Sequence, residues 1–251
     1  MNGEVFDLCV IALSARRALS EHTPFIMQGS KYIAERRFIF CDGYGYTDSA
    51  EEWYRISQKR GMSSIRLFLP VSVKDRNHLG FINTSSGFLA VVQENGTVLH
   101  IDPEWTWLKS RNAWRVIYRE SPMNQPADQL PVFTDQTEQL KNVLTEIRDL
   151  ALAIKEPFFA NCFQDAYDLL DGKDSGNKKG LFSDLPPRCG NILNAVSRAD
   201  VFGAMGSWND CPPYESRAIG REEDYERLSA ELLHQIRVNL MYAVNSCYSE
   251  S

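Results

Sequence analysis

The sequence lacks long apolar runs. No apolar stretch approaches the ~20 residues that span a bilayer, so we expect no transmembrane helix and no membrane partner. The run 6–15 (FDLCVIALSA) follows Glu4, contains Asp7 near its start and precedes Arg16 and Arg17, which reverses the charge order of a signal peptide. We therefore expect this run to form a buried or amphipathic helix of the mature protein.

Closely spaced cysteines are also lacking. The six cysteines form no CxxC pair, and a chain of 251 residues is too large to depend on disulfide bonds. We therefore expect free thiols and a location in a reducing cytoplasm. The cysteines are Cys9, Cys41, Cys162, Cys189, Cys211 and Cys247.

Local signatures of catalysis, metal binding and nucleotide binding are absent. The chain has no HExxH, EF-hand loop, GxSxG elbow, P-loop or GxGxxG, so we expect neither a metal nor a cofactor. His100 and Asp102 share one face of an expected strand, an arrangement that is common by chance. The glycines of residues 42–46 (DGYGY) indicate a tight turn flanked by aromatic residues.

Excess positive charge is lacking as well. The net charge of -6 argues against nonspecific binding to nucleic acid, which needs a cationic surface. Residues 1–125 hold 15 basic and 13 acidic side chains, whereas residues 126–251 hold 12 and 20. The acidic second half either attracts a basic partner protein or simply presents solvated helix surfaces.

The first half contains patterns of a helix and of several strands. Ser49 and Glu52 form a capping-box pattern for a helix over 49–60, which Gly61 ends. Asn95-Gly96 predicts a hairpin with a type I′ turn. Alternating residues over 113–119 predict a half-buried antiparallel strand. The expected strands are 65–69, 87–93, 97–102 and 113–119.

Three prolines between residues 121 and 131 neither continue a strand nor start a helix easily, so we place a connector there. We expect an α+β protein with a mixed, mostly antiparallel N-terminal domain over 1–120, which contains one or two helices. An acidic helical bundle over 132–251 follows.

Helical periodicity governs the second half. One helix covers 140–154, capped by Thr134 or Asp135, and a second begins at Pro157 and ends before Gly172. Residues 173–180 (KDSGNKKG) indicate a polar loop. The remaining expected helices are 191–202 and 222–246.

The most unusual string is 199–210, ADVFGAMGSWND. Its glycines permit a close backbone approach or a left-handed turn, and the four residues after them present one aromatic and three short polar groups. The string forms a binding site, or Trp208 fills the bundle while Asn209 and Asp210 cap backbone groups. The candidate binding residues are Gly203, Gly206, Ser207, Trp208, Asn209 and Asp210.

The string 201–210 (VFGAMGSWND), with 225–232 and 243–245, resembles the C-terminal region of a family of uncharacterised bacterial proteins. Residues 80–96 (GFINTSSGFLAVVQENG) are similar to the N-terminal region of that family. The resemblance implies a bacterial origin and a shared architecture over most of the chain. It implies no activity and no functional residue.

Aromatic residues offer a second candidate surface in the first half. Trp105 and Trp107 stand two apart and share a face of an extended segment, and Trp53, Tyr44 and Tyr46 could lie near them. Exposed together, these rings would form a recognition patch. Buried together, they would form the core between sheet and helices.

Three functions remain open on this basis. The first is a cytoplasmic, non-enzymatic binding protein of the immunity type, which holds a basic protein on its acidic helical surface. The second is an enzyme with a site near Ser207–Asp210, in which Asp210 is the acid or base and Trp208 is a pocket wall. The third is a small-ligand sensor with a cavity lined by Trp53, Trp105 or Trp107.

Overall fold

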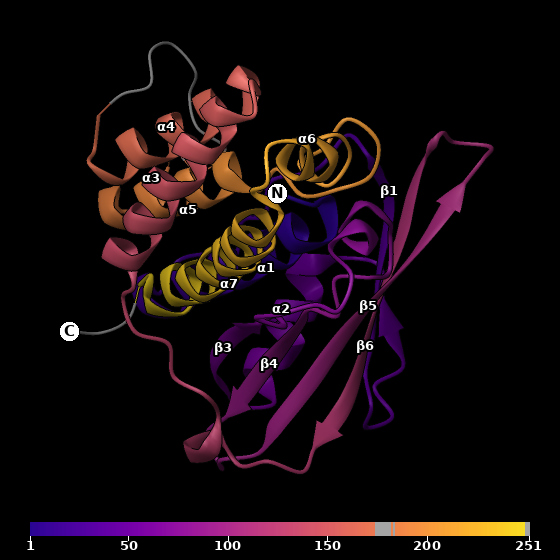
Figure 1. Ribbon diagram of the computed structural model, residues 1–251. Helices are drawn as coiled ribbons and strands as arrows, with labels where there is room; N and C mark the ends of the chain where they lie inside the picture. The colour runs from indigo at the N-terminus through magenta and orange to yellow at the C-terminus, as the bar shows by residue number, and fades with distance from the viewer. Residues whose placement is uncertain (174–181, 183, 249–251) are drawn as a thin grey trace. The chain divides into compact units, whose positions relative to one another are not determined.

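The computed structural model describes residues 1–173, 182 and 184–248, and it shows an α+β fold in two compact units (Figure 1). The sheet unit comprises Gly3–Leu69, Ser85–Val132 and the residues from Val244 onward. The helical unit comprises Met1–Asn2, Pro70–Thr84 and Phe133–Ala243. Pro70–Thr84 thus belongs with the C-terminal helices, although it precedes the expected connector.

A mixed six-stranded sheet organises the sheet unit, with strand order β2-β1-β6-β5-β4-β3. β1 and β6 are parallel, and the other neighbouring strands are antiparallel, so the sheet is mostly antiparallel as expected. The elements are α1 (Gly3–Glu21), β1 (Ile33–Ile39), β2 (Tyr46–Thr47), α2 (Ala50–Lys59), β3 (Met62–Phe68), β4 (Phe88–Gln93), β5 (Val98–Leu108), β6 (Ala113–Met123) and η2 (Ala127–Gln129).

The beginning and end of α2 follow from the sequence. The Ser49 hydroxyl accepts a hydrogen bond from the backbone N–H of Glu52 at 3.1 Å, and Gly61 adopts a φ of +83° after the helix. Only half of the expected capping box forms, because the Glu52 carboxylate accepts from the Thr47 hydroxyl at 2.7 Å. α1 likewise confirms the helix expected over 6–15.

The β4–β5 hairpin forms, but the type I′ turn is wrong. Gly96 has a positive φ of +82°, whereas Asn95 does not, and a type I′ turn requires positive φ at both positions. The backbone N–H of Gln93 donates to Thr97 O, and that of Gly96 donates to Gln93 O, both at 2.9 Å. These bonds close a three-residue loop over 94–96 in which glycine takes the left-handed position.

The proline-rich stretch also contains more strand than expected. β6 continues through Pro122, which lies opposite Leu99 of β5. β1 pairs with β6 only as far as Arg119, so the side of β6 away from β5 has no strand neighbour at Pro122 in the described chain. A proline without an N–H is tolerated at such an edge position.

The core of the sheet unit is a column of aromatic rings. Phe38 stacks between Tyr118 and Trp53, with ring centroids 4.9 Å apart on both sides. Beside the column, the Asp7 carboxylate of α1 accepts hydrogen bonds from the Tyr118 hydroxyl and from the Arg36 guanidinium, the latter at 2.6 Å. A buried carboxylate needs such partners to offset its lost hydration.

The helical unit contains the four helices that periodicity predicts, with shifted ends. α3 begins after Gln136 rather than after Thr134 or Asp135, and α5 ends at Ala199. All of the loop expected over 173–180 except Lys173 lies outside the described residues. The elements are η1 (Arg76–Gly80), α3 (Thr137–Ala153), α4 (Pro157–Leu170), α5 (Pro187–Ala199), α6 (Pro212–Ala218) and α7 (Glu222–Ser246), which ends in the sheet unit.

None of the described helices is both long and apolar enough to cross a membrane. The six cysteines are free thiols, of which Cys41 and Cys211 are exposed and the other four are buried.

Candidate functional site

Trp208 lies at the centre of the helical unit rather than on a pocket wall. Its side chain is fully buried, and its ring makes edge-to-face contacts with Phe159 and Phe163 of α4 at 5.2 and 5.3 Å. The indole N–H donates to the Ser229 hydroxyl at 2.8 Å, and the Tyr225 hydroxyl donates to the carbonyl oxygen of Trp208 at 2.9 Å. Trp208 therefore fills the bundle, with its polar atoms satisfied.

Asp210 stabilises the loop that contains Trp208. Its carboxylate accepts the backbone N–H of Gly206 at 2.7 Å, and Gly206 has a φ of +77°. The Ser207 hydroxyl accepts the backbone N–H of Asn209 at 3.2 Å. Asp210 and Ser207 thus stabilise a turn beside the buried Trp208.

Asn209 joins two segments that are far apart in sequence. Its amide donates to Gly203 O at 3.2 Å and to Arg76 O at 3.0 Å. We call these two hydrogen bonds the Asn209 clamp. Close to it, a Cβ atom added to Gly80 would lie only 2.5 Å from the backbone nitrogen of Ala204. Glycine is required there because the two backbones touch, and residues 74–80 are thereby fixed against the 203–210 loop.

A pocket of about 400 Å³ opens at this junction. Three parts of the helical unit surround it: the segment around η1, the Asn209 loop, and α6 with the first turns of α7. Its lining residues are Lys74, Asp75, Arg76, Asn77, Asn209, Pro213, Tyr214, Arg217, Glu222, Tyr225 and Glu226.

Both arginines of this pocket are neutralised internally. Arg76 pairs with Glu226 at 2.6 Å and lies 5.8 Å from the centre of the Tyr225 ring, and Arg217 pairs with Glu222. Burial raises the pKa of Tyr225, and the charge of Arg76 opposes that rise. The Tyr225 hydroxyl therefore remains a neutral hydrogen-bond donor to Trp208 at neutral pH.

Several polar groups of the lining have no partner among the described residues. The exposed Lys74 ammonium forms no ion pair there. The buried Nε of Arg76 and the buried Oδ1 of Asn209 have no hydrogen-bond partner. Because buried polar atoms in folded proteins nearly always have partners, these two atoms are exceptions on residues that line the pocket.

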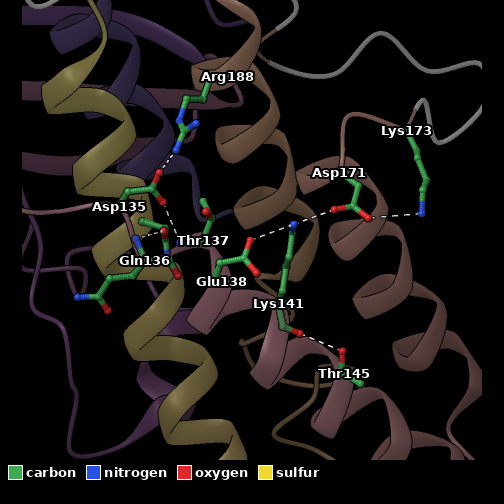
Figure 2. A network of polar contacts seen from close by, with 10 residues as sticks. Asp135, Gln136, Thr137, Glu138, Lys141, Thr145, Asp171, Lys173 and Arg188 are labelled. Atoms are coloured by element: carbon green, nitrogen blue, oxygen red, sulfur yellow. Dashed lines mark hydrogen bonds and ion pairs between the residues drawn. The ribbon is translucent and has the colours of Figure 1, made fainter.

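Most acidic side chains of the helices in the helical unit form ion pairs. Figure 2 shows one chain of such contacts, in which Lys141 bridges Glu138 at 3.2 Å and Asp171 at 2.7 Å. The hydrogen bond from Lys141 lowers the pKa of Asp171, and Lys173 lies 3.4 Å from the same carboxylate. Further pairs across the unit are Asp135–Arg188, Glu146–Arg227 and Asp165–Arg198.

One group of carboxyl groups is not neutralised in this way. Burial, and then the neighbouring Glu215 carboxylate, raise the pKa of Glu156. The charges of Asp210, Glu215 and Glu156 also act on the exposed thiol of Cys211, and the pKa of that thiol is raised, with Asp210 as the largest cause. Glu156, Asp210 and Glu215 therefore place negative charge close together, and none of them forms an ion pair with a described cation.

The tryptophans of the sheet unit do not form one patch. Trp53 is fully buried against Phe38. Trp105 is buried and Trp107 is 41% exposed, and both contact Trp114 edge-on. The three candidate tryptophans line neither the pocket of the helical unit nor a hollow of the sheet unit that residues 27–29, 33–36 and 48–51 surround.

His100 and Asp102 pair with each other, with Nδ1 3.1 Å from the carboxylate. In the described part of the chain, no three His, Cys, Asp or Glu side chains are grouped as a metal site.

Sequence reasoning found Asn209 but missed the rest of the pocket. Residues 74–77 carry no motif, and we predicted no element over 212–218, which begins with two prolines. The signal that we missed is the order of the two helix-breaking residue types. Pro212 starts the helix, and Gly220, with a φ of +72°, follows its end.

No family model, curated protein or solved structure matches this chain significantly.

Proposed function

We propose that the protein binds a small organic anion in the pocket formed by residues 74–77, Asn209, α6 and α7. The observation that carries the proposal is the Lys74 ammonium: both arginines of the pocket are paired with glutamates and the neighbouring Asp75 accepts the backbone N–H of Asn77 at 2.9 Å, whereas Lys74 is not paired among the described residues. The volume of about 400 Å³ lies within the usual range of small-molecule sites.

Each part of the pocket has a role in this proposal. The Lys74 ammonium is a compact charge on a flexible stem, and it attracts the anionic group of the ligand. The Tyr214 side chain, which is 72% exposed, offers a ring face and a hydroxyl to the rest of the ligand. The Asn209 clamp and the Arg76–Glu226 pair hold the backbone next to Lys74 against the 203–210 loop and α7 before the ligand arrives.

Thermal-shift measurements with a panel of carboxylates, amino acids and nucleoside monophosphates test this proposal. A compound that binds only the folded protein raises its melting temperature. The shift should disappear in Lys74→Met, which removes the charge and keeps the apolar stem, and it should shrink in Tyr214→Ala. It should persist in Lys109→Met, since Lys109 is an exposed lysine of the sheet unit. No shift with any compound, or equal shifts in all three variants, would refute the proposal.

A basic protein partner is the second candidate. The unneutralised carboxyl groups around Glu156 and Glu215 favour it, because they present negative potential without an internal cation. Its test is the salt dependence of binding to a lysine-rich peptide. Glu215→Gln should weaken that binding, whereas Asp149→Asn, which alters an exposed carboxylate already paired with Arg148, should not.

A further inference from the structure

The pocket of the helical unit has as many cationic as anionic side chains in its lining. The cations are Lys74, Arg76 and Arg217, and the anions are Asp75, Glu222 and Glu226. Arg76 pairs with Glu226 at 2.6 Å, and Arg217 pairs with Glu222. One ammonium group and one carboxylate of the lining remain, and they belong to Lys74 and Asp75.

Lys74 and Asp75 are neighbours in the chain, yet they do not pair with each other. In the part of the chain that the structure describes, Lys74 forms no ion pair with a carboxylate, and Asp75 forms none with a lysine or an arginine. Both residues nevertheless line the same pocket. Two charges of opposite sign are therefore presented side by side to whatever enters it.

The carboxylate of Asp75 is only partly used within the protein. Its Oδ1 accepts the backbone N–H of Asn77 at 2.9 Å, which caps η1. Its Oδ2 lies 3.6 Å from Nε2 of His78, a contact that is an ion pair only when the imidazole is protonated. Because a carboxylate accepts about four hydrogen bonds and this side chain is 46% exposed, Asp75 can accept further hydrogen bonds from a ligand.

A ligand that meets both charges has to carry both signs itself. A simple anion meets the Lys74 ammonium but brings its charge close to the Asp75 carboxylate, and like charges repel. A zwitterion offers a carboxylate to Lys74 and an ammonium group to Asp75. Because the Cα atoms of consecutive residues are only about 3.8 Å apart, these two side chains suit a ligand whose charges are also close together. An α-amino acid carries both groups on one carbon atom.

We propose that the ligand of this pocket is a free α-amino acid, whose carboxylate is bound by Lys74 and whose ammonium group is bound by Asp75. This assignment rests on the function proposed above, and it narrows the ligand from compounds with an anionic group to those that also carry an ammonium group. The exposed ring of Tyr214, with Pro213 next to it in the lining, contacts the side chain of the amino acid.

Calorimetric titration of the full-length protein tests this assignment. The common L-amino acids are first screened by thermal shift at neutral pH, and the best of them is titrated beside its N-acetyl derivative and its primary amide. Acetylation removes the ammonium group and amidation removes the carboxylate, while both keep the side chain. We expect each derivative to bind about tenfold more weakly or worse, because each leaves one charged group of the pocket without its partner.

Asp75→Asn separates the ammonium contact from general effects. Asparagine keeps a side-chain oxygen that can accept the N–H of Asn77, so the cap of η1 is retained. The variant should bind the amino acid about tenfold more weakly, and it should no longer prefer the amino acid to the N-acetyl derivative. Asp128→Asn is the matched control, since it alters an exposed aspartate in η2 of the sheet unit and should leave both affinities unchanged.

The outcomes distinguish this assignment from the proposed function. Equal affinity of the unaltered protein for the amino acid and its N-acetyl derivative would overturn the role of Asp75, and so would an undiminished preference in Asp75→Asn. Binding of other carboxylates or of nucleotides, but of no amino acid, would overturn the ligand class alone. If no compound binds, or if Lys74→Met binds the amino acid as tightly as the unaltered protein does, the proposed function is refuted as well.

Discussion

The two units of this protein differ in how deeply they bury ion pairs between side chains. In the sheet unit, Asp7 and Arg36 form an ion pair whose side chains are 3% and 15% exposed, and the hydroxyl of the fully buried Tyr118 completes it. In the helical unit, Asp165 and Arg198 pair while 41% and 42% exposed. The first pair is part of a core, and the second lies on a solvated surface.

This difference matters because the cost of losing one partner depends on burial. A buried charge that loses its partner cannot recover its hydration, whereas an exposed one is solvated at once. The stability of the sheet unit should therefore depend on its ion pairs. That of the helical unit should depend on the aromatic cluster around Trp208.

The largest expected effect comes from Asp7→Ala. This substitution leaves the Arg36 guanidinium without its carboxylate and the buried Tyr118 hydroxyl without its acceptor. We expect the free energy of unfolding, measured in urea, to fall by about 3–5 kcal/mol. Asp165→Ala is the matched control and should cost no more than about 1 kcal/mol. Equal losses in the two variants would contradict the comparison.

The next effect concerns the core of the helical unit. Trp208→Phe keeps an aromatic ring but removes the indole N–H that donates to Ser229, and it leaves a small void between Phe159 and Tyr225. We expect a loss of about 1–3 kcal/mol in the same urea experiment. Trp107→Phe serves as a control, because that ring is 41% exposed and should cost much less. A cost for Trp107→Phe that matches or exceeds that of Trp208→Phe would argue against Trp208 as the centre of the core.

The sequence was sufficient for the features that local chemistry determines. The cap at Ser49, the start of α4 at Pro157 and the long α7 follow from residue types at fixed spacings. The turn at Asn95-Gly96 shows the limit, since the same dipeptide suits two kinds of loop and the strand register selects between them.

The candidate site is formed by contacts between segments that are far apart in the sequence. No local sequence pattern indicates these contacts. Asn209 bonds to Arg76 across 133 positions of the chain, and Gly80 touches the backbone of Ala204. Neither contact leaves a periodic signal in a single sequence. Likewise, the string around Trp208 is consistent with a site and with a core, and the burial of Trp208 against Phe159 and Phe163 is visible only in the structure.

A smaller effect is expected at the surface of the helical unit. Arg188→Ala removes the partner of Asp135, and the Arg188 side chain is 72% exposed. We expect a loss of no more than about 1 kcal/mol, which shrinks further as salt is added. Urea unfolding at low and high ionic strength measures it. A loss as large as that of Asp7→Ala would mean that the exposed pairs hold the helical unit together.

The smallest effect, and the only stabilising one, is expected from Glu215→Gln. Burial, and then the charge of Glu215, raise the pKa of Glu156 above its ordinary value. A carboxyl group whose pKa is higher in the folded than in the unfolded state binds more protons when folded, so it destabilises the protein at neutral pH and ceases to do so as it becomes protonated. Removing the charge of Glu215 should therefore raise the melting temperature at pH 7 by at most about 2 °C. The gain should vanish as the pH falls through the range in which Glu156 is protonated. Glu223→Gln is a matched control on α7, and a gain of the same size there, or one that persists in acid, would show that general charge reduction rather than the Glu156–Glu215 contact is responsible.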